Sequence, residues 1–429
     1  MPRRKRRNWP LLIAMLAVAV LLLVYAVGWP LVSALLASAQ GLVKRPRPFL
    51  VPFVDQVPIR LFEFLIFAWL FVFGSCLGSF LNVVIYRVPR GFSLWGSSHC
   101  PFCRVRIPVR DNIPVFGWLM LRGRCSTCRL PISPRYPLVE LAVGLLILIL
   151  GMLEILLAGV NLPGFGERGF AGLTVSWLVG HPRWDLIGTC ILHSGLVGVL
   201  LSWALIRSDG CFLPPRYVAF AFGVALLLTA LTPAAGPHVR PPDGQAWQAW
   251  LTDWASGGTG PVGLLGGLLL GIIVAAGCRL AGRDATAQDP HREDKPCETA
   301  LAERRSQLRR GGGVADALAG LGLVGASLGW PAAVSVGLLA SAARLLGALT
   351  LGVSPRRRPV PLLAYVCPAT FVHICLWRWL DALAFWPSDA ADNLAIAAAV
   401  AMVLVLTWQA SVLERLAARA WTVSDQSVP

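Results

Sequence analysis

Four cysteines carry the clearest chemistry in this sequence. They form two C-x-x-C pairs, Cys100 with Cys103 and Cys125 with Cys128, which are separated by roughly 20 residues. Two such turns can place four thiolates tetrahedrally around one Zn²⁺. A site with four cysteine ligands leaves no coordination position open for a substrate. The spacing therefore predicts one structural zinc ion at Cys100, Cys103, Cys125 and Cys128.

Other interpretations of these cysteines are weaker. Disulfide bonds are disfavoured because the loop is expected on the reducing, cytoplasmic side of a membrane. A thioredoxin-type redox pair would need a βαβ context, which the surrounding sequence lacks. His99 adjoins the first pair, but four cysteines already complete a tetrahedral shell. We therefore expect His99 not to bind the metal.

The elements that position this loop are apolar. Of the 429 residues, 56% are hydrophobic and only 14% are charged, whereas a soluble domain carries about 25% charged residues. The apolar residues occur in long runs, which indicates a membrane protein that crosses the bilayer several times. Disorder, collagen, coiled coil and a secreted disulfide scaffold are excluded as descriptions of the whole chain. The net charge of +16 is assigned to cytoplasmic loops, and no nucleic-acid partner is expected.

The runs predict nine or ten spans at about 20 residues each. They cover residues 11–39, 61–86, 137–160, 186–206, 217–231, 261–278, 315–328, 330–351, 362–380 and 394–412. Glycine and alanine dominate the pair that begins at residue 315, and such small residues let helices pack closely in a bilayer. The expected fold is an all-α polytopic membrane protein of about 9–10 transmembrane helices with a small cytoplasmic zinc-binding loop domain.

Basic residues set the predicted orientation. They cluster at residues 3–7, 87–135, 279–310 and 356–358, and alternating spans place all of these segments in the cytoplasm. The loops 161–185 and 232–260 carry few basic residues and fall outside. The first run could be a signal peptide, because Ala37-Ser38-Ala39 is typical of a cleavage site. Its length instead favours an uncleaved anchor.

The residues that flank the cysteines carry a family resemblance. They include Gly78-Ser79-Phe80-Leu81-Asn82, Asp111-Asn112-Ile113-Pro114 and Tyr136-Pro137-Leu138-Val139-Glu140. This segment resembles the bifunctional type IV prepilin peptidases, closely and continuously over residues 73–141. Weaker likeness follows at Gly325-Ala326-Ser327-Leu328-Gly329-Trp330 and at Pro359-Val360-Pro361-Leu362, so that the resemblance covers residues 61–379.

The resemblance implies an activity. Members of this family cut the leader of a pilin-like precursor after its glycine and then methylate the new N-terminal amine with S-adenosylmethionine. It also implies a multi-pass protein of the bacterial inner membrane that contacts membrane lipid and serves pilus biogenesis or type II secretion. No G-x-G-x-x-G follows a predicted strand. We therefore expect cytoplasmic loops to form any methyl-donor site.

The second catalytic aspartate of the family is matched by Asp316. It closes the segment Gly311-Gly312-Gly313-Val314-Ala315-Asp316, in which Ala315 replaces the glycine of the family's G-x-G-D motif. Alanine fits that position poorly if it requires a positive φ. The alternative is that Asp316 only caps the N-terminus of a helix.

The first catalytic aspartate is altered. In the register set by Ile206 and Leu213-Pro214, its position is occupied by Arg207. Asp209 lies two residues later and is the remaining candidate. On a helix such a shift rotates the side chain by about half a turn. Arg207 cannot exchange a proton near neutral pH, so we expect it to pair with Asp316 or with phosphates and to weaken or abolish cleavage.

Four domains are predicted. Residues 1–58 form an anchor or signal region, and residues 59–141 a prepilin-peptidase-like N-terminal domain with the zinc loop at 87–136. Residues 142–384 form an aspartyl-peptidase-like membrane domain with a charged insert at 279–310, and residues 385–429 add a last span and tail. Glu140 matches an acid of the family, although a carboxylate near a helix N-terminus is also favourable by itself.

Three hypotheses remain open. The first is an active prepilin peptidase and N-methyltransferase with Asp316 and Asp209 as catalytic residues. The second is a proteolytically degenerate relative that binds or only methylates pilin-like substrates. The third is a non-enzymatic assembly component. The cysteine pairs favour the first two, and Arg207 favours the second over the first.

Overall fold

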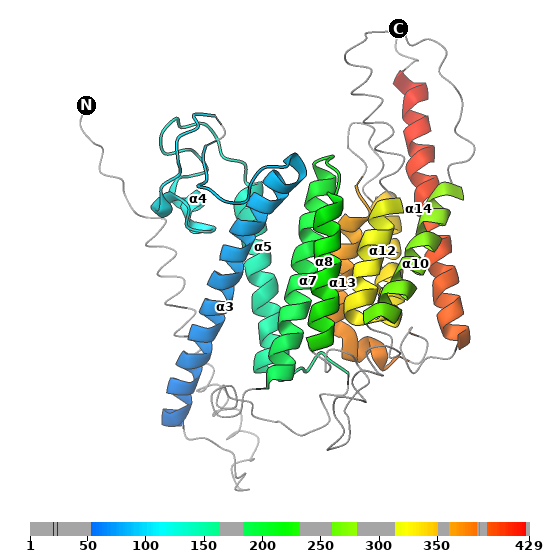
Figure 1. Ribbon diagram of the computed structural model, residues 1–429, viewed down its shortest axis with the longest axis horizontal. Coiled ribbons are helices and arrows are strands. Elements are labelled where there is room, and N and C mark those ends of the chain that lie inside the picture. Colours follow the sequence, from blue (N-terminus) through cyan, green and yellow to red (C-terminus); the bar gives the residue numbers. More distant parts are fainter. Residues whose placement is uncertain are drawn as a thin grey trace, which may run out of the picture. The chain divides into compact units, whose positions relative to one another are not determined.

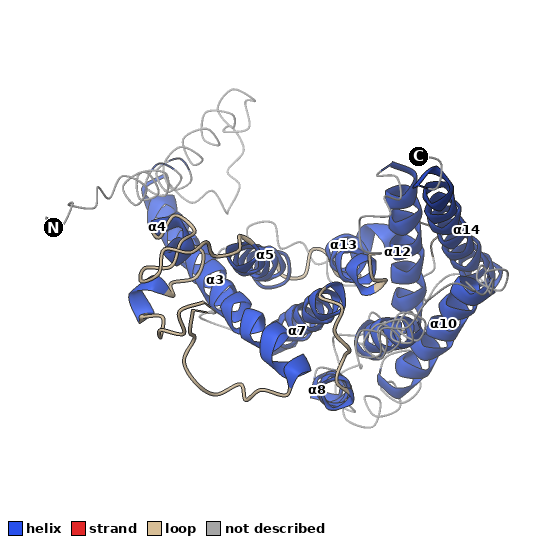
Figure 2. Ribbon diagram, turned by 90° about the horizontal axis from the view of Figure 1, so that it is seen from above, coloured by secondary structure: helices blue, strands red, loops and turns tan. Residues whose placement is uncertain are grey.

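The computed structural model describes residues 20, 24, 53–100, 102–163, 183–231, 260–280, 314–350, 360–383, 386 and 393–425. These residues form helices and loops, with two isolated β-bridges and no strand among them (Figures 1 and 2). The chain divides into two compact units. The first takes Met1–Val84, Ser93–Ala158 and Arg168–Arg183, and the second takes the remainder.

Two apolar helices frame the first unit. They are α3 (Phe53–Arg87), of which the last residues belong to the second unit, and α5 (Arg135–Leu150), which continues as a π-helical turn η5 (Gly151–Leu156). A Cβ on Gly74 would lie 2.9 Å from the Cα of Gly144, and a Cβ on Gly78 would lie 2.7 Å from the Cα of Glu140. The Gly-x-x-x-Gly spacing thus allows the two backbones to approach closely.

The segment between these helices carries the cysteines. Residues 93–134, which we call the tetracysteine loop, contain the short helices η4 (Val109–Asp111) and α4 (Phe116–Met120). Before the loop, η3 (Val88–Arg90) ends α3. The Asn82 side-chain amide near the end of α3 donates to the Tyr136 carbonyl at the start of α5 at 3.1 Å, so the helix ends that flank the loop lie side by side.

The second unit is a bundle of apolar helices. Its members are α7 (Trp184–Ser208), α8 (Pro215–Leu231), α10 (Gly260–Leu280), the helix Val314–Leu328, α12 (Trp330–Thr350), α13 (Leu363–Asp381) and α14 (Asn393–Asp425). Helix α12 packs against α13, α14 and α10, while α7 packs against α13 and α8. The indole of Trp203 is fully buried and meets the ring of Tyr217 edge-on at 6.3 Å.

Glycines set the position of the helix that carries Asp316. A Cβ on Gly267 would collide with the carbonyl of Leu321, and a Cβ on Gly271 would lie 2.9 Å from the carbonyl oxygen of Ala317. A later residue of α10 thus meets an earlier residue of the helix Val314–Leu328. The two helices therefore run antiparallel in near backbone contact, as small residues permit in a bilayer.

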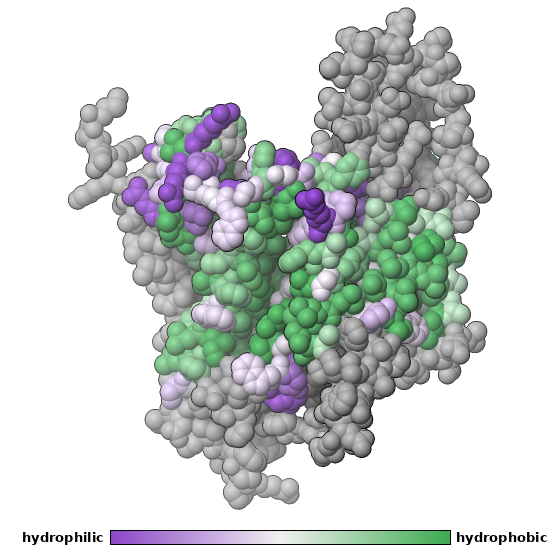
Figure 3. Space-filling view, viewed as in Figure 1, coloured by the Kyte–Doolittle hydropathy of each residue, from purple (hydrophilic) through white to green (hydrophobic). Residues whose placement is uncertain are grey.

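The predicted spans agree with the described helices. Seven helices are long and apolar enough to cross a membrane, and Pro215–Leu231 and Val314–Leu328 are shorter apolar helices. Together they match nine of the ten predicted runs. The run at 11–39 and nearly all of the insert at 279–310 lie outside the described residues. Hydrophobic residues cover much of the visible sides of the described helices, and hydrophilic residues gather toward their ends (Figure 3). An all-helical polytopic membrane protein is confirmed.

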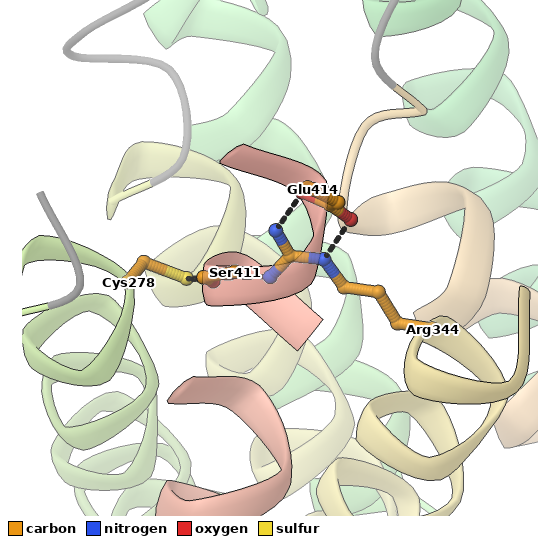
Figure 4. Close-up of polar contacts among 4 residues, drawn as sticks. All are labelled: Cys278, Arg344, Ser411 and Glu414. Atoms are coloured by element: carbon orange, nitrogen blue, oxygen red, sulfur yellow. Dashed lines mark hydrogen bonds and ion pairs between the residues drawn. The ribbon is translucent and has the colours of Figure 1, made fainter. Parts of the chain in front are cut away.

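An ion pair joins the last helix to the bundle. Arg344 on α12 donates from Nε to Glu414 Oε1 at 3.0 Å and from Nη2 to Glu414 Oε2 at 2.7 Å. Its third nitrogen donates to the sulfur of Cys278 on α10, which also accepts a bond from Ser411 (Figure 4). A two-fold carboxylate–guanidinium contact of this kind has strong geometric specificity and fixes α14 against α12 and α10.

Candidate metal centre and aspartate site

The first C-x-x-C pair forms a compact backbone turn. The Cys100 N–H donates to the Val105 carbonyl at 3.0 Å, and the Arg104 N–H donates to the Cys100 carbonyl at 2.9 Å. The Ile107 N–H closes the turn by donating to Ser98 at 2.9 Å. Arg104 adopts φ of 57°, a left-handed conformation that most residues avoid. The turn directs both thiols of the pair toward one point.

The second pair repeats this turn 25 positions later. The Cys125 N–H donates to Leu130 at 2.9 Å, the Arg129 N–H to Cys125 at 3.1 Å, and the Ile132 N–H to Gly123 at 2.7 Å. Arg129, like Arg104, is left-handed, with φ of 62°. The sequence analysis missed this structural repeat. Its signal was the shared pattern C-x-x-C-R, in which an arginine occupies the left-handed position each time.

The four thiols meet at one site. The sulfur atoms of Cys100, Cys103, Cys125 and Cys128 all lie within 4.8 Å of one another, and the Cys100 and Cys128 sulfurs are 3.8 Å apart. A tetrahedron with Zn–S bonds of about 2.3 Å has S···S edges of about 3.8 Å. No disulfide is formed among the described cysteines. The donor set and its spacing fit a tetrahedral metal ion, and His99 is not part of the group.

The pKa values of two of the four thiols are shifted in opposite directions. The amides of Cys128 and Thr127 point toward the Cys125 sulfur and lower its pKa to about 6. The Leu130 amide also favours a thiolate at Cys128, but desolvation and the hydrogen bonds of the three neighbouring thiols outweigh it and raise the pKa of Cys128 to about 11. One ligand is thus ionised at neutral pH, while another keeps a proton that a metal must displace.

Two side chains fix the loop to its surroundings. The indole Nε1 of Trp118 donates to the carbonyl of Ile132 at 3.0 Å, which ties α4 to the second turn. Glu140, in α5, accepts the Val115 N–H at 2.7 Å and a hydrogen bond from Ser79 on α3. Val115 has φ of 61°, a costly conformation for a β-branched residue. Glu140 therefore holds a strained turn of the loop against the apolar helices.

The candidate aspartate site is occupied by an ion pair. Arg207, in the last turn of α7, lies 2.8 Å from Oδ1 and 3.0 Å from Oδ2 of Asp316 through its Nε. Its Nη1 donates to the Cys211 carbonyl at 3.0 Å, and its guanidinium lies 5.8 Å from the centre of the Phe212 ring. The exposed fractions of the two side chains are 13% for Arg207 and 4% for Asp316. The predicted pairing of Arg207 with Asp316 is therefore observed.

The two predicted catalytic aspartates occupy different settings. Asp316 lies inside its helix, which begins among the described residues at Val314, so its carboxylate does not act as an N-cap. Asp209 follows the last residue of α7, where its N–H donates to Leu205. Asp209 is half-buried. The catalytic roles of Asp316 and Asp209 stay predictions.

Comparisons with known proteins match the first unit. Residues 72–153 match the family model of the bacterial peptidase A24 N-terminal domain. A prepilin leader peptidase/N-methyltransferase of Klebsiella pneumoniae is 48% identical over 99 residues, which cover 21% of this chain and 43% of the relative. One from Myxococcus xanthus is 56% identical over 79 residues, which cover 18% and 24%. A type 4 prepilin-like proteins leader peptide-processing enzyme of Escherichia coli is 43% identical over 158 residues, which cover 30% and 55%.

The matches are partial. The aligned part spans about half, or less, of the length of these relatives, and no solved structure matches the chain. Fold and site together define a multi-pass bacterial membrane protein with a tetracysteine domain between two apolar helices. Residues 72–153 of this chain match the bacterial peptidase A24 N-terminal domain, and the relatives that are similar in this part are named prepilin leader peptidase/N-methyltransferase.

Proposed function

We propose that this protein is a prepilin leader peptidase and N-methyltransferase of the bacterial inner membrane, which acts on pilin-like precursors in pilus biogenesis or type II secretion. The observation that carries the proposal is the tetracysteine domain. The residues that match the family model include the four cysteines, and the sulfur atoms of these cysteines all lie within 4.8 Å of one another. Substrates and activity are taken from the names of the relatives, which share this domain.

The domain's cofactors follow from the same proposal. Zn²⁺ is the metal that a closed set of four cysteines selects, and its role is structural. The methyl group would come from S-adenosylmethionine, bound by loops at the cytoplasmic ends of the helices. The proposed organisation is an N-terminal anchor or signal region at residues 1–58, the domain of 59–141, the membrane domain of 142–384, and an added span and tail at 385–429.

Cleavage would require two carboxyl groups that share a proton around one water. Asp316 would supply one and Asp209 the other. In the described geometry the Asp316 carboxylate instead binds the Arg207 guanidinium at 2.8 Å. Cleavage therefore requires Arg207 to leave Asp316, so that Asp209 can take its place.

The ion pair supports a second candidate function. A relative that has lost cleavage would still bind or methylate pilin-like substrates through the first unit. Arg207 is the specific observation in its favour, since it neutralises Asp316 at 2.8 Å and is itself held by the Cys211 carbonyl. The two functions differ in one step only, the cut after the leader glycine.

Complementation of a strain that lacks its prepilin peptidase tests the proposal. Leader removal is read from the size of the pilin, and methylation from the mass of its N-terminal residue. A pre-cleaved pilin supplied to purified protein separates methylation from cleavage. Methylation that disappears on Cys100→Ser but not on Cys76→Ser supports the proposed function. No cleavage, no methylation and no binding of a prepilin would contradict both candidates.

A further inference from the structure

The two repeated turns of the tetracysteine loop differ in their side chains. Phe102 lies just before the second cysteine of the first turn, and its side chain is 61% exposed. The corresponding residue of the second turn is Thr127. Two further apolar residues of the first half are strongly exposed, Trp95 at 90% and Val109 at 85%. The three most exposed large apolar side chains of the loop thus lie in residues 93–110, whereas Ile113, Leu119, Met120 and Leu130 of the second half are 43–46% exposed.

Arginines alternate with these apolar residues. Arg104, Arg106 and Arg110 are exposed and belong to the same half of the loop. Across residues 93–134 there are six arginines and a single acid, Asp111. That acid is 11% exposed and lies 3.8 Å from the Nε of Arg110. The surface that this half offers is therefore both apolar and strongly cationic.

The loop is tethered to a bilayer at both ends. It leaves the apolar helix α3 and enters the apolar helix α5. Aromatic side chains gather at the membrane–water interface, and clusters of arginine near a membrane bind anionic headgroups. The bilayer, with its anionic headgroups and apolar interior, is therefore always within reach of this surface.

We propose that residues 93–110 dock on the anionic phospholipid surface of the membrane that the protein spans. Trp95, Phe102 and Val109 enter the interfacial region, while Arg104, Arg106 and Arg110 contact lipid phosphates. The other half of the loop, with the polar tip Thr127, faces away from the lipid. This inference does not rest on the proposed enzymatic function. Proximity favours lipid over a protein partner, because both ends of this cationic loop enter helices that are apolar and long enough to cross a membrane.

Hydrogen–deuterium exchange tests the proposal on the full-length, zinc-loaded protein. The protein is placed in nanodiscs of phosphatidylcholine alone, or of phosphatidylcholine with phosphatidylglycerol. Backbone amides of residues 93–110 should exchange more slowly in the anionic discs, and added salt should remove this protection. Replacing Arg104, Arg106 and Arg110 by Gln should weaken the docked state about fivefold for each arginine removed.

The second half of the loop supplies a matched control. Arg122, Arg124 and Arg129 replaced by Gln remove the same charge but should leave the protection of residues 93–110 largely in place. Phe102→Thr, which copies the tip of the second turn, should reduce the protection without loss of zinc. Equal exchange in both lipid compositions would overturn the proposal, as would equal effects of the two triple variants. Protection that appears only when a prepilin is added would assign the surface to substrate instead.

Discussion

The tetracysteine loop lies in the first unit and the aspartate region in the second. The two regions differ in how fully their residues match the chemistry that the sequence predicts for them. In the loop all four ligands are present, and two equivalent backbone turns hold them at metal-binding distances. In the aspartate region the position at which the sequence analysis expects the first acid carries Arg207, which binds Asp316. A tetrahedral metal site requires all its ligands at once. An acid pair, by contrast, is converted by one substitution into an ion pair that is stable without substrate.

The largest expected effect concerns the complete site. Cys125→Ser should remove nearly all bound zinc, because four-cysteine sites depend on every ligand and their binding free energy is about 10–16 kcal/mol. Metal analysis of purified protein measures zinc per chain, with about one equivalent expected in the wild type. Cys76→Ser, which changes an exposed thiol of α3, is the control and should keep its zinc. Iron in place of zinc would contradict the assignment.

Breaking the ion pair should have the next largest effect. Arg207→Met leaves the Asp316 carboxylate buried without its cation, which costs about 3–5 kcal/mol. The double variant Arg207→Met with Asp316→Leu should recover most of that loss, since replacing both charges by apolar groups is often neutral or stabilising. Thermal unfolding in detergent compares the wild type, the single variants Arg207→Met and Asp316→Leu, and the double variant. If the double variant is as unstable as the sum of both single changes, the pair is not coupled.

One methyl group added between the packed helices α3 and α5 should lower the stability of the first unit. Gly78→Ala places a Cβ 2.7 Å from the Cα of Glu140, and overpacking of this kind costs about 1–3 kcal/mol. The same change at Gly195, whose Cβ would meet no atom within 4 Å, serves as the control and should not destabilise. Unfolding temperatures that fall equally in both variants would show that the α3–α5 contact is looser than described.

Zinc affinity should depend on pH in a defined direction. The Cys128 thiol, with a pKa of about 11, is protonated below that pH, so zinc must displace its proton. Displacement of this proton by itself contributes about a tenfold weakening of zinc binding for each unit by which pH falls. The Cys125 thiol, with a pKa of about 6, contributes a further proton only below about pH 6, where the slope should steepen. Competition with a chelator between pH 5 and 8 measures the slope, and a flat profile would contradict the unequal thiols.

Much of this molecule is encoded locally and was predictable. The apolar runs predicted nine of the described helices, because hydrophobic length by itself decides a membrane span. The cysteine spacing predicted the four thiols that meet at one site. The register around Leu213-Pro214 indicated Arg207 as a cation that would pair with Asp316 or with phosphates, and the structure shows the pair with Asp316. Each of these signals lies in a few neighbouring residues.

Other features depend on contacts between distant residues. Arg344 and Glu414 are 70 positions apart in separate apolar runs, and neither run indicates that the two charges neutralise each other. Likewise the left-handed Val115 is stabilised by Glu140, 25 residues later. No sequence pattern predicts a positive φ for a valine at this position. Such pairings arise only when the helices are assembled.

Prepilin cleavage by matched variants tests the central contrast most directly. Wild type, Arg207→Asp and Asp209→Asn are reconstituted with one cognate prepilin, and the released leader is quantified alongside zinc content. The account predicts weak or no cleavage by the wild type, a gain of cleavage in Arg207→Asp as the second acid is restored, and equal zinc in all three. Robust wild-type cleavage that Arg207→Asp does not increase would contradict this contrast, because the ion pair of Arg207 with Asp316 would then not limit cleavage.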